Sequence, residues 1–143
     1  MTTIDILGDE ETFKNIVERT ITEIEDNEVE SIGGTAFLGC NSLTSASFLV
    51  VTSIGDVAFH SCSNLTSVSF PVVTDIAKKA FFSCNKLTTM YIGTESNTVC
   101  TLGVDAIPSS VTDIYVPEAL VDLYKTANNW SSFADKIKAY TGV

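Results

Sequence analysis

Apolar residues recur along this chain at a fixed interval of 22 positions. Ile32, Ile54 and Ile76 form one column of the repeat, and four further columns hold Ala36, Ala58 and Ala80, then Phe37, Phe59 and Phe81, then Cys40, Cys62 and Cys84, then Leu43, Leu65 and Leu87. A period of about 20 to 29 residues is typical of stacked repeats, in which each unit buries its apolar side against its neighbours. The pattern predicts a β-rich, right-handed solenoid.

Within each unit, one short segment alternates between apolar and polar residues. Leu65, Val68 and Phe70 are expected to point inward from a parallel strand, while Thr66, Ser67 and Ser69 point outward. The Ala-Phe pair is expected in a tight helical turn. The strand pattern begins in degenerate form at residues 21–25 and returns at 111–117, 24 positions after Leu87. Because residues 95–110 match no column, the repeats should span 21–117 and end in a stretched, irregular coil.

The two ends predict helical caps on a single domain of residues 1–143. Residues 9–19 open with acids, and Phe13, Ile16 and Val17 share one helix face, so residues 1–20 are expected to be an N-terminal cap. Residues 118–143 should form the C-terminal cap. It would contain one helix with a stripe of Leu120, Leu123, Tyr124 and Ala127, ended by Asn128 and Asn129, and a second with Trp130, Phe133, Ile137 and Tyr140.

Charge is concentrated at the start of the chain. The net charge is −10, and residues 1–30 contribute −8 of it. The largest basic cluster is Lys78 and Lys79, so nucleic acid and anionic membrane are poor partners. The acidic end is expected to be a solvated cap, with a patch for a basic partner as the alternative. No apolar run reaches the roughly 20 residues of a membrane span. Residues 1–7 lack a signal-peptide pattern, as a fragment of a longer protein would.

The cysteines share a column rather than a pairing pattern. Cys40, Cys62 and Cys84 should lie ~4.8 Å apart in adjacent coils, within reach of a disulfide, but side chains in one ladder project in parallel and three cannot all pair. We expect a buried thiol ladder. The close spacing of zinc ligands is absent, which disfavours a metal site. Cys100 lies outside the column and is expected to be the most exposed thiol.

Residues 54–71 resemble the BspA-type leucine-rich repeat, whose strand LxxIxLP is followed by an IgxxAFxxC turn. The tail from residues 107–111 to 136–138 resembles the segment that often closes such repeats in bacterial and phage-associated proteins. The resemblance implies a bacterial surface or secreted module, or a phage structural module, that binds proteins or glycans without chemistry of its own. It implies an extracellular or cell-surface location, with a phage particle or the cytoplasm as alternatives. It transfers no ligand and no functional residue.

An enzyme is disfavoured by the inventory of reactive side chains. The single histidine, His60, shares its column with Leu38 and Phe82, which suggests packing rather than acid–base chemistry. Nucleophile triads, phosphate-binding glycine loops and metal motifs are missing, so no catalytic residue, cofactor or metal is predicted. Glu23 and Glu25 share a strand face, but an open face offers no apolar pocket to raise the pKa of either carboxyl.

The outward strand face offers a concrete binding surface. It changes along its length from acids, through small hydroxyls, to tyrosines. Tyrosine is enriched at binding hot spots, so the candidate binding residues are Tyr91, Tyr115 and Asp113, with Glu23 and Glu25 at the acidic end. The predicted function is non-enzymatic recognition of a protein or glycan by a monomer. Two alternatives stay open: a solvated sheet whose tyrosines merely favour strands, and a structural spacer or assembly element of a surface or phage tail protein.

Overall fold

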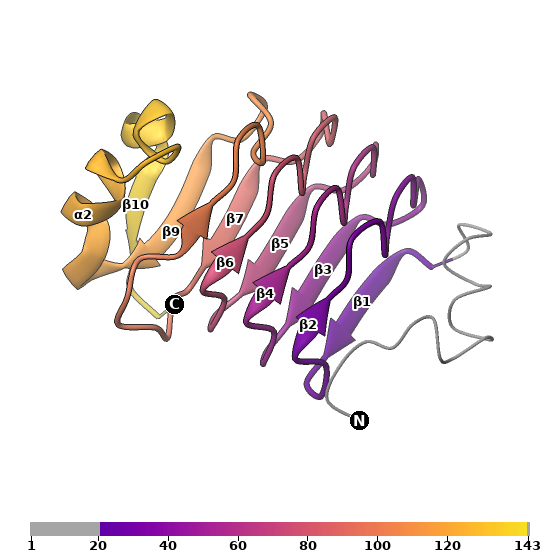
Figure 1. Cartoon of the computed structure of the whole chain (residues 1–143), viewed down its shortest axis with the longest axis horizontal. Coiled ribbons are helices and arrows are strands. Elements are labelled where there is room, and N and C mark those ends of the chain that lie inside the picture. The colour runs from indigo at the N-terminus through magenta and orange to yellow at the C-terminus, as the bar shows by residue number, and fades with distance from the viewer. Residues whose placement is uncertain (1–20, 143) are drawn as a thin grey trace.

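The computed structural model describes residues 21–142, which form two open sheets of parallel strands. The strands are stacked one after another along the long axis of the molecule, and each strand crosses that axis (Figure 1). The larger sheet has the order β1-β3-β5-β7-β9-β10 and the smaller one the order β2-β4-β6-β8. Their bounds are β1 Glu23–Asp26, β2 Ser31–Ile32, β3 Ser45–Phe48, β4 Ser53–Ile54, β5 Ser67–Phe70, β6 Asp75–Ile76, β7 Thr89–Ile92, β8 Thr101–Leu102, β9 Asp113–Pro117 and β10 Ile137–Tyr140.

Strand register follows the repeat of the sequence. A coil is one strand of the larger sheet followed by one strand of the smaller sheet. In the regular coils, each strand residue pairs with the residue 22 positions further along the chain. Ser45 pairs with Ser67, and Ile32 pairs with Ile54. Because β3, β5 and β7 alternate buried and less buried positions, the inward columns meet between the sheets. The predicted parallel strands and their alternation are confirmed.

Aromatic rings fill the space between the sheets. Phe59 stacks on Phe37 with ring centroids 4.9 Å apart and on Phe81 with centroids 5.1 Å apart. A second stack joins Phe48 and Phe70 at 5.7 Å. All five rings are fully buried. Offset stacking of this kind adds to the free energy gained from removing the rings from water, so identical side chains in successive coils stabilise the register.

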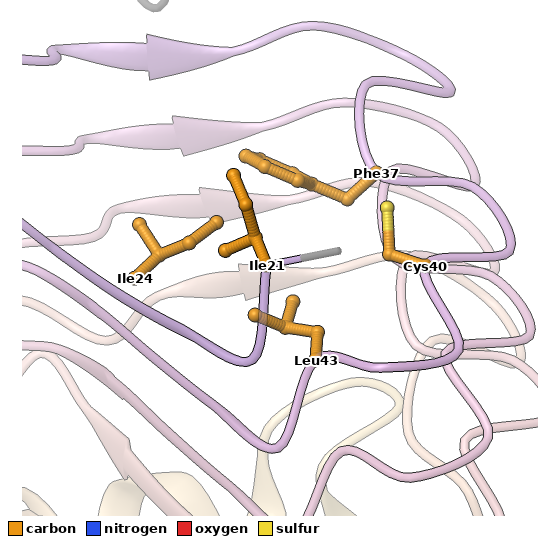
Figure 2. Close-up of a pocket in the computed structure, with 5 residues that line it drawn as sticks. All are labelled: Ile21, Ile24, Phe37, Cys40 and Leu43. Atoms are coloured by element: carbon orange, nitrogen blue, oxygen red, sulfur yellow. The ribbon is translucent and has the colours of Figure 1, made fainter. Parts of the chain in front are cut away.

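At the N-terminal end of the described core, five apolar side chains converge. Ile21 and Ile24 lie against Phe37, Cys40 and Leu43 (Figure 2). The space between them is too small for a water molecule. The predicted N-terminal cap of residues 1–20 lies outside the described residues.

The turn that carries the Ala-Phe pair is not helical, so this prediction is wrong. Ala58 N–H donates to Gly55 O within its own coil at 3.2 Å, whereas Phe59 N–H donates to Ala80 O of the next coil at 2.7 Å. Val57 has a φ of 52°, which interrupts any helix. A helix would direct all N–H groups within one coil. The alternating arrangement instead uses half of them to join neighbouring coils.

The last coil keeps its columns, contrary to the expectation that residues 95–110 match none. Thr101 pairs with Asp75, and Leu102 pairs with Ile76, at an interval of 26 rather than 22 residues. Asp113 then pairs with Thr89 at an interval of 24. The segment between β7 and β8 is therefore four residues longer than in other coils, and the segment before β9 is two residues shorter. Because four residues are inserted and two are deleted in this coil, its columns could not be recognised from the 22-residue period.

The C-terminal segment matches its prediction in part. A 3₁₀ turn, η1 (Glu118–Leu120), leads into the helix α2 (Val121–Thr126), as expected. The second predicted helix is wrong, because a 3₁₀ segment, η2 (Ser131–Lys136), is followed by β10, which pairs in parallel with β9. Helical caps at both ends are thus not confirmed. Ile137 is buried and Lys138 exposed, an alternation that suits an edge strand.

Three side chains cover the open edge of the smaller sheet. Trp130 Nε1 donates to Cys100 O at 2.7 Å, and Asn129 Nδ2 donates to Leu102 O at 2.6 Å. Cys100 N–H donates to the hydroxyl of Tyr124 at 2.9 Å. Cys100 is consequently buried, so its prediction as the most exposed thiol is wrong. The C-terminal segment protects this edge from pairing with another strand.

Candidate functional site

A ladder of threonines runs along the beginning of the outer strands. Thr44 Oγ1 donates to Thr22 O at 2.9 Å, and Thr66 Oγ1 donates to Thr44 O at 3.0 Å. Thr88 Oγ1 continues the series at 3.4 Å, and Thr112 Oγ1 lies 3.3 Å from Thr88 O, although its single hydrogen is shared with the nearer Asp113 Oδ2. These hydroxyls bond the preceding coil, so their role in the molecule is to join coils, and their donor hydrogens are not available to a ligand.

Three tyrosines meet on the outer face of β7, β9 and β10, and we call them the tyrosine patch. The rings of Tyr91 and Tyr115 stack with centroids 5.1 Å apart and planes 15° apart. Tyr140 lies edge-on to Tyr91, with centroids 5.9 Å apart and planes 85° apart. Tyr91 and Tyr115 meet because the two strands pair at these residues. All three side chains are half-buried, and the contacts hold each ring in place.

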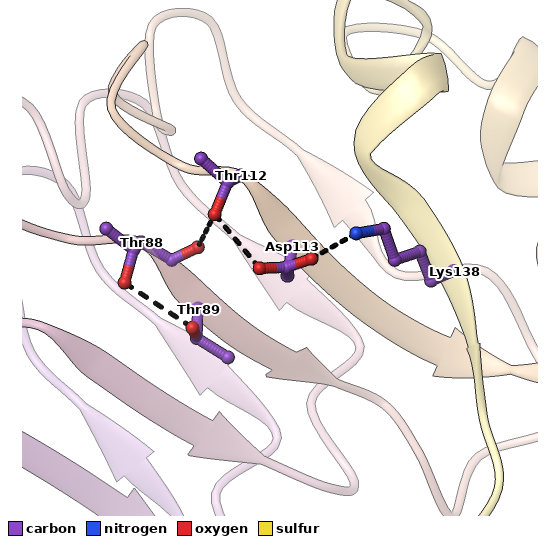
Figure 3. Close-up of polar contacts among 5 residues, drawn as sticks. All are labelled: Thr88, Thr89, Thr112, Asp113 and Lys138. Carbon is purple, nitrogen blue, oxygen red and sulfur yellow. Dashed lines mark hydrogen bonds and ion pairs between the residues drawn. The ribbon is translucent and has the colours of Figure 1, made fainter.

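An ion pair borders the tyrosine patch (Figure 3). Lys138 Nζ donates to Asp113 Oδ1, and Thr112 Oγ1 donates to Asp113 Oδ2 at 2.9 Å. The hydrogen bond from Lys138, with that from Thr112, lowers the pKa of the Asp113 carboxyl below its usual value. The same bond raises the pKa of the Lys138 ammonium. Lys138 is exposed and Asp113 only half-buried, so the pair fixes side-chain positions more than it stabilises the fold.

The structure brings only some of the predicted site residues together. Tyr91, Tyr115 and Asp113 lie on the adjacent strands β7 and β9. Glu23 and Glu25 are exposed on β1, three strand positions from β7. With strands ~4.8 Å apart, β1 lies ~14 Å from β7. The acidic pair therefore belongs to a different part of the same face.

The sequence analysis did not predict that Tyr140 and Lys138 belong to this surface. Their segment was interpreted as a helix because Trp130, Phe133, Ile137 and Tyr140 recur at three- and four-residue steps. The usable signal was the alternation in Ile137–Tyr140, in which a buried residue precedes an exposed lysine. Four residues are too short a window to separate a strand from a helix by periodicity alone.

The single histidine, His60, packs against neighbouring side chains. The ring of His60 lies 5.2 Å from that of Phe82, and its Nδ1 is 2.8 Å from Ser61 Oγ. Between residues 21 and 142, no three side chains of His, Cys, Asp or Glu gather closely enough to hold a metal ion. None of the helices described is long and apolar enough to cross a membrane.

Comparison with known proteins gives a family and a fold. A family model described as a BspA-type leucine-rich repeat region matches residues 8–133 in six copies. No curated protein matches the sequence. A leucine-rich repeat protein from Bacteroides ovatus ATCC 8483 is 22% identical with a TM-score of 0.61, over 85% of this chain and 30% of that chain. This similarity establishes the fold, and the present chain spans under a third of that protein.

Two other solved structures are more distant. A leucine-rich repeat protein from T. pallidum is 21% identical with a TM-score of 0.41, over 63% of this chain and 53% of that chain. A leucine-rich cell surface protein from Faecalibacterium prausnitzii A2-165 is 21% identical with a TM-score of 0.40, over 67% of this chain and 38% of that chain.

Proposed function

Since the chain belongs to the BspA-type leucine-rich repeat family, we propose that it is a non-enzymatic binding module that recognises a protein or glycan through its outer strand face. The tyrosine patch supports this proposal most strongly. Three half-buried aromatic rings fixed against one another form a rigid surface that loses little conformational entropy on binding. Such residues dominate the binding energy at many interfaces.

The polar groups of the patch suit recognition. Within residues 21–142, the hydroxyls of Tyr91, Tyr115 and Tyr140 make no hydrogen bond to the protein, so each can donate to a ligand and accept from it. The Lys138–Asp113 pair adds a fixed positive and a fixed negative group beside the rings. A cluster of aromatic rings bordered by hydroxyls and a neutralised ion pair suits a sugar ring or an uncharged protein loop.

The acidic end of the same face would contact only a long ligand. Glu23 and Glu25 lie ~14 Å from β7, so they engage a ligand at the tyrosine patch only if it crosses β3 and β5. We propose them as secondary contacts. A basic segment at that end of the ligand would complement their charge.

The test begins with glycan and extracellular-protein arrays probed with the whole chain, and continues with the affinity of each ligand found for purified variants. We expect Tyr115→Ala to weaken binding at least tenfold, and Tyr91→Ala to do the same. Ser47→Ala changes the same outer ladder at β3, so it is the matched control and should leave affinity unchanged. Equal affinities for the tyrosine variants and the wild type would refute the proposed site.

We also propose three finer features: the right-handed solenoid that the repeat pattern predicts, a monomeric state, and the extracellular or cell-surface location that the family resemblance implies. Light scattering measures the state of association directly. Fractionation of the source cells, followed by detection of the native protein, tests its location. A monomer that binds nothing on either array would favour the structural-spacer alternative over recognition.

A further inference from the structure

The turns that carry the Ala-Phe pairs form a directional ladder along one side of the molecule. Each of these turns donates at least two backbone N–H groups to carbonyl oxygens of the next coil, and the first two turns donate a third, from Gly39 and Ser61. The first series comprises Thr35 to Asp56 at 3.1 Å, Val57 to Lys78 at 3.1 Å and Lys79 to Val104 at 3.0 Å. The second comprises Phe37 to Ala58 at 2.7 Å, Phe59 to Ala80 at 2.7 Å and Phe81 to Ala106 at 2.9 Å. The acceptors are always two residues apart.

This ladder ends with unused donors in the last coil. Asp105 and Ile107 follow the acceptors Val104 and Ala106, and so occupy the donor positions of Lys79 and Phe81. Asp105 has a φ of 58°, close to the 54° of Lys79, so the backbone keeps the conformation of a donor turn. Within residues 21–142, the N–H groups of Asp105 and Ile107 have no acceptor. Asn129 and Trp130 occupy acceptors at Leu102 and Cys100 instead.

A hollow of about 340 Å³ adjoins these two donors. Its wall includes Asp105, Ile107, Val104 and Phe133, with Ser132 among its polar groups. Val104 is 54% exposed, which is unusual for a valine, and Ile107 is only 7% exposed. Asp105 is exposed and Ile107 is buried, so a ligand that accepts from Ile107 N–H would satisfy a donor on a buried residue. The hollow therefore combines an apolar wall with donors that lack partners.

We propose that this last turn binds a peptide segment of a partner protein, which places two carbonyl oxygens, two residues apart, against the N–H groups of Asp105 and Ile107. Within the molecule, every preceding turn donates to backbone carbonyls of its neighbour that have this spacing. An apolar side chain of the peptide packs on Val104 and Phe133. The peptide carries positive charge, because Asp105 is the only charged side chain among the described residues that line the hollow. This site is separate from the tyrosine patch.

The experiment uses the whole, isotope-labelled chain and a peptide copied from its own ladder. The probe is Ile-Ala-Lys-Lys-Ala-Phe with blocked ends, the sequence of residues 76–81, because it contains the two carbonyls that accept from the N–H groups of the preceding turn. We expect titration to shift the amide resonances of Asp105 and Ile107 in a saturable manner. Replacement of both lysines of the probe by glutamate should weaken binding at least tenfold.

Two variants of the protein distinguish binding in the hollow from non-specific attraction of a basic peptide to an acidic protein. Val104→Lys brings a bulky cation into the wall and should weaken binding at least tenfold. Leu123→Lys adds the same charge at a side chain that is 57% exposed and outside the hollow, so it should not. Shifts confined to β1 or to the tyrosine patch would overturn the proposal. So would a dimer in which both amides are protected from hydrogen exchange before any probe is added, because a second copy would then be the occupant.

Discussion

The indole Nε1 of Trp130 donates a hydrogen bond to the carbonyl oxygen of Cys100 over 2.7 Å. In earlier coils, the equivalent carbonyl accepts a backbone N–H from the next coil, as Glu30 O accepts from Thr52 and Thr74 O from Thr101. The tryptophan side chain therefore takes the place of a following coil. It satisfies a buried backbone acceptor and packs edge-on against Tyr124, with ring centroids 5.0 Å apart.

Trp130→Phe should destabilise the fold by about 1–3 kcal/mol, because the variant keeps an aromatic ring but leaves Cys100 O without its donor. Trp130→Ala should cost about 3–5 kcal/mol, since a fully buried ring is lost as well. Urea denaturation measures both. Leu123→Ala is the control on the same segment, and its exposed side chain should change stability by less than about 0.5 kcal/mol. A Trp130→Phe variant as stable as the wild type would contradict the role of this bond.

Stability should fall in alkaline solution through Tyr124. Burial raises the pKa of Tyr124 from 10.0 to about 12. A raised pKa means that folding favours the protonated phenol. The stability that this preference contributes is complete below pH 10 and is lost as the pH rises towards 12. Burial raises the pKa of the Cys100 thiol in the same direction. Each group adds a slope of at most about 1.4 kcal/mol per pH unit.

The variant Tyr124→Phe distinguishes the effect of the Tyr124 phenol on alkaline stability from that of the Cys100 thiol. At neutral pH the variant should be less stable by about 1–3 kcal/mol, because the hydroxyl no longer accepts from Cys100 N–H. Above pH 10 the difference between variant and wild type should shrink. Denaturation curves at a series of pH values record it. A constant difference up to pH 12 would show that the phenol ionises alike in the folded and unfolded chains.

The four cysteines should be slow to react with a thiol reagent while the protein is folded. Cys40, Cys62, Cys84 and Cys100 are all buried, and none of them forms a disulfide. Cys62 Sγ donates to Phe37 O at 3.1 Å, and Cys84 Sγ to Phe59 O at 2.9 Å. We expect all four to react on unfolding, and reducing agent to leave the unfolding midpoint unchanged. Rapid labelling of Cys100 in the native protein would contradict its position behind Trp130.

Phe59→Ala should destabilise the protein by about 3–5 kcal/mol, because it empties the centre of the Phe37–Phe59–Phe81 stack. The change removes contacts on both sides of the ring, so neighbouring coils cannot easily collapse into the space. Phe82→Ala is the matched control, since Phe82 is 39% exposed and at the surface. It should cost less than about 1 kcal/mol. Comparable losses for the two variants would argue against the stack as the source of stability.

The sequence predicted what depends on strict repetition. Strand register, the inward columns and the cysteine column follow from the 22-residue period, because a one-residue slip would turn every apolar side chain outward. The Ala-Phe turn was misread because hydrogen bonds between coils, rather than local propensity, determine its conformation. Cys100 was misjudged because the side chain that covers it, Trp130, lies 30 residues further on.

The tyrosine patch was predicted in part for a related reason. Tyr91 and Tyr115 are placed by the parallel register of the strands. Tyr140 joins them only because β10 returns to the larger sheet, and a four-residue strand after an irregular segment leaves a weak periodic signal. The Lys138–Asp113 pair depends on the same strand. The pairing of β10 with β9 therefore completes the tyrosine patch, and the local sequence pattern predicted only Tyr91 and Tyr115.

The most direct test of recognition by the outer face is a hydrogen-exchange and resonance map of the whole chain with a ligand found on the arrays. We predict that the largest changes on binding lie in β7, β9 and β10, at Tyr91, Tyr115 and Tyr140, and that the opposite, smaller sheet is unaffected. Changes that spare these three tyrosines and fall elsewhere would contradict the assignment of the outer face as the binding surface.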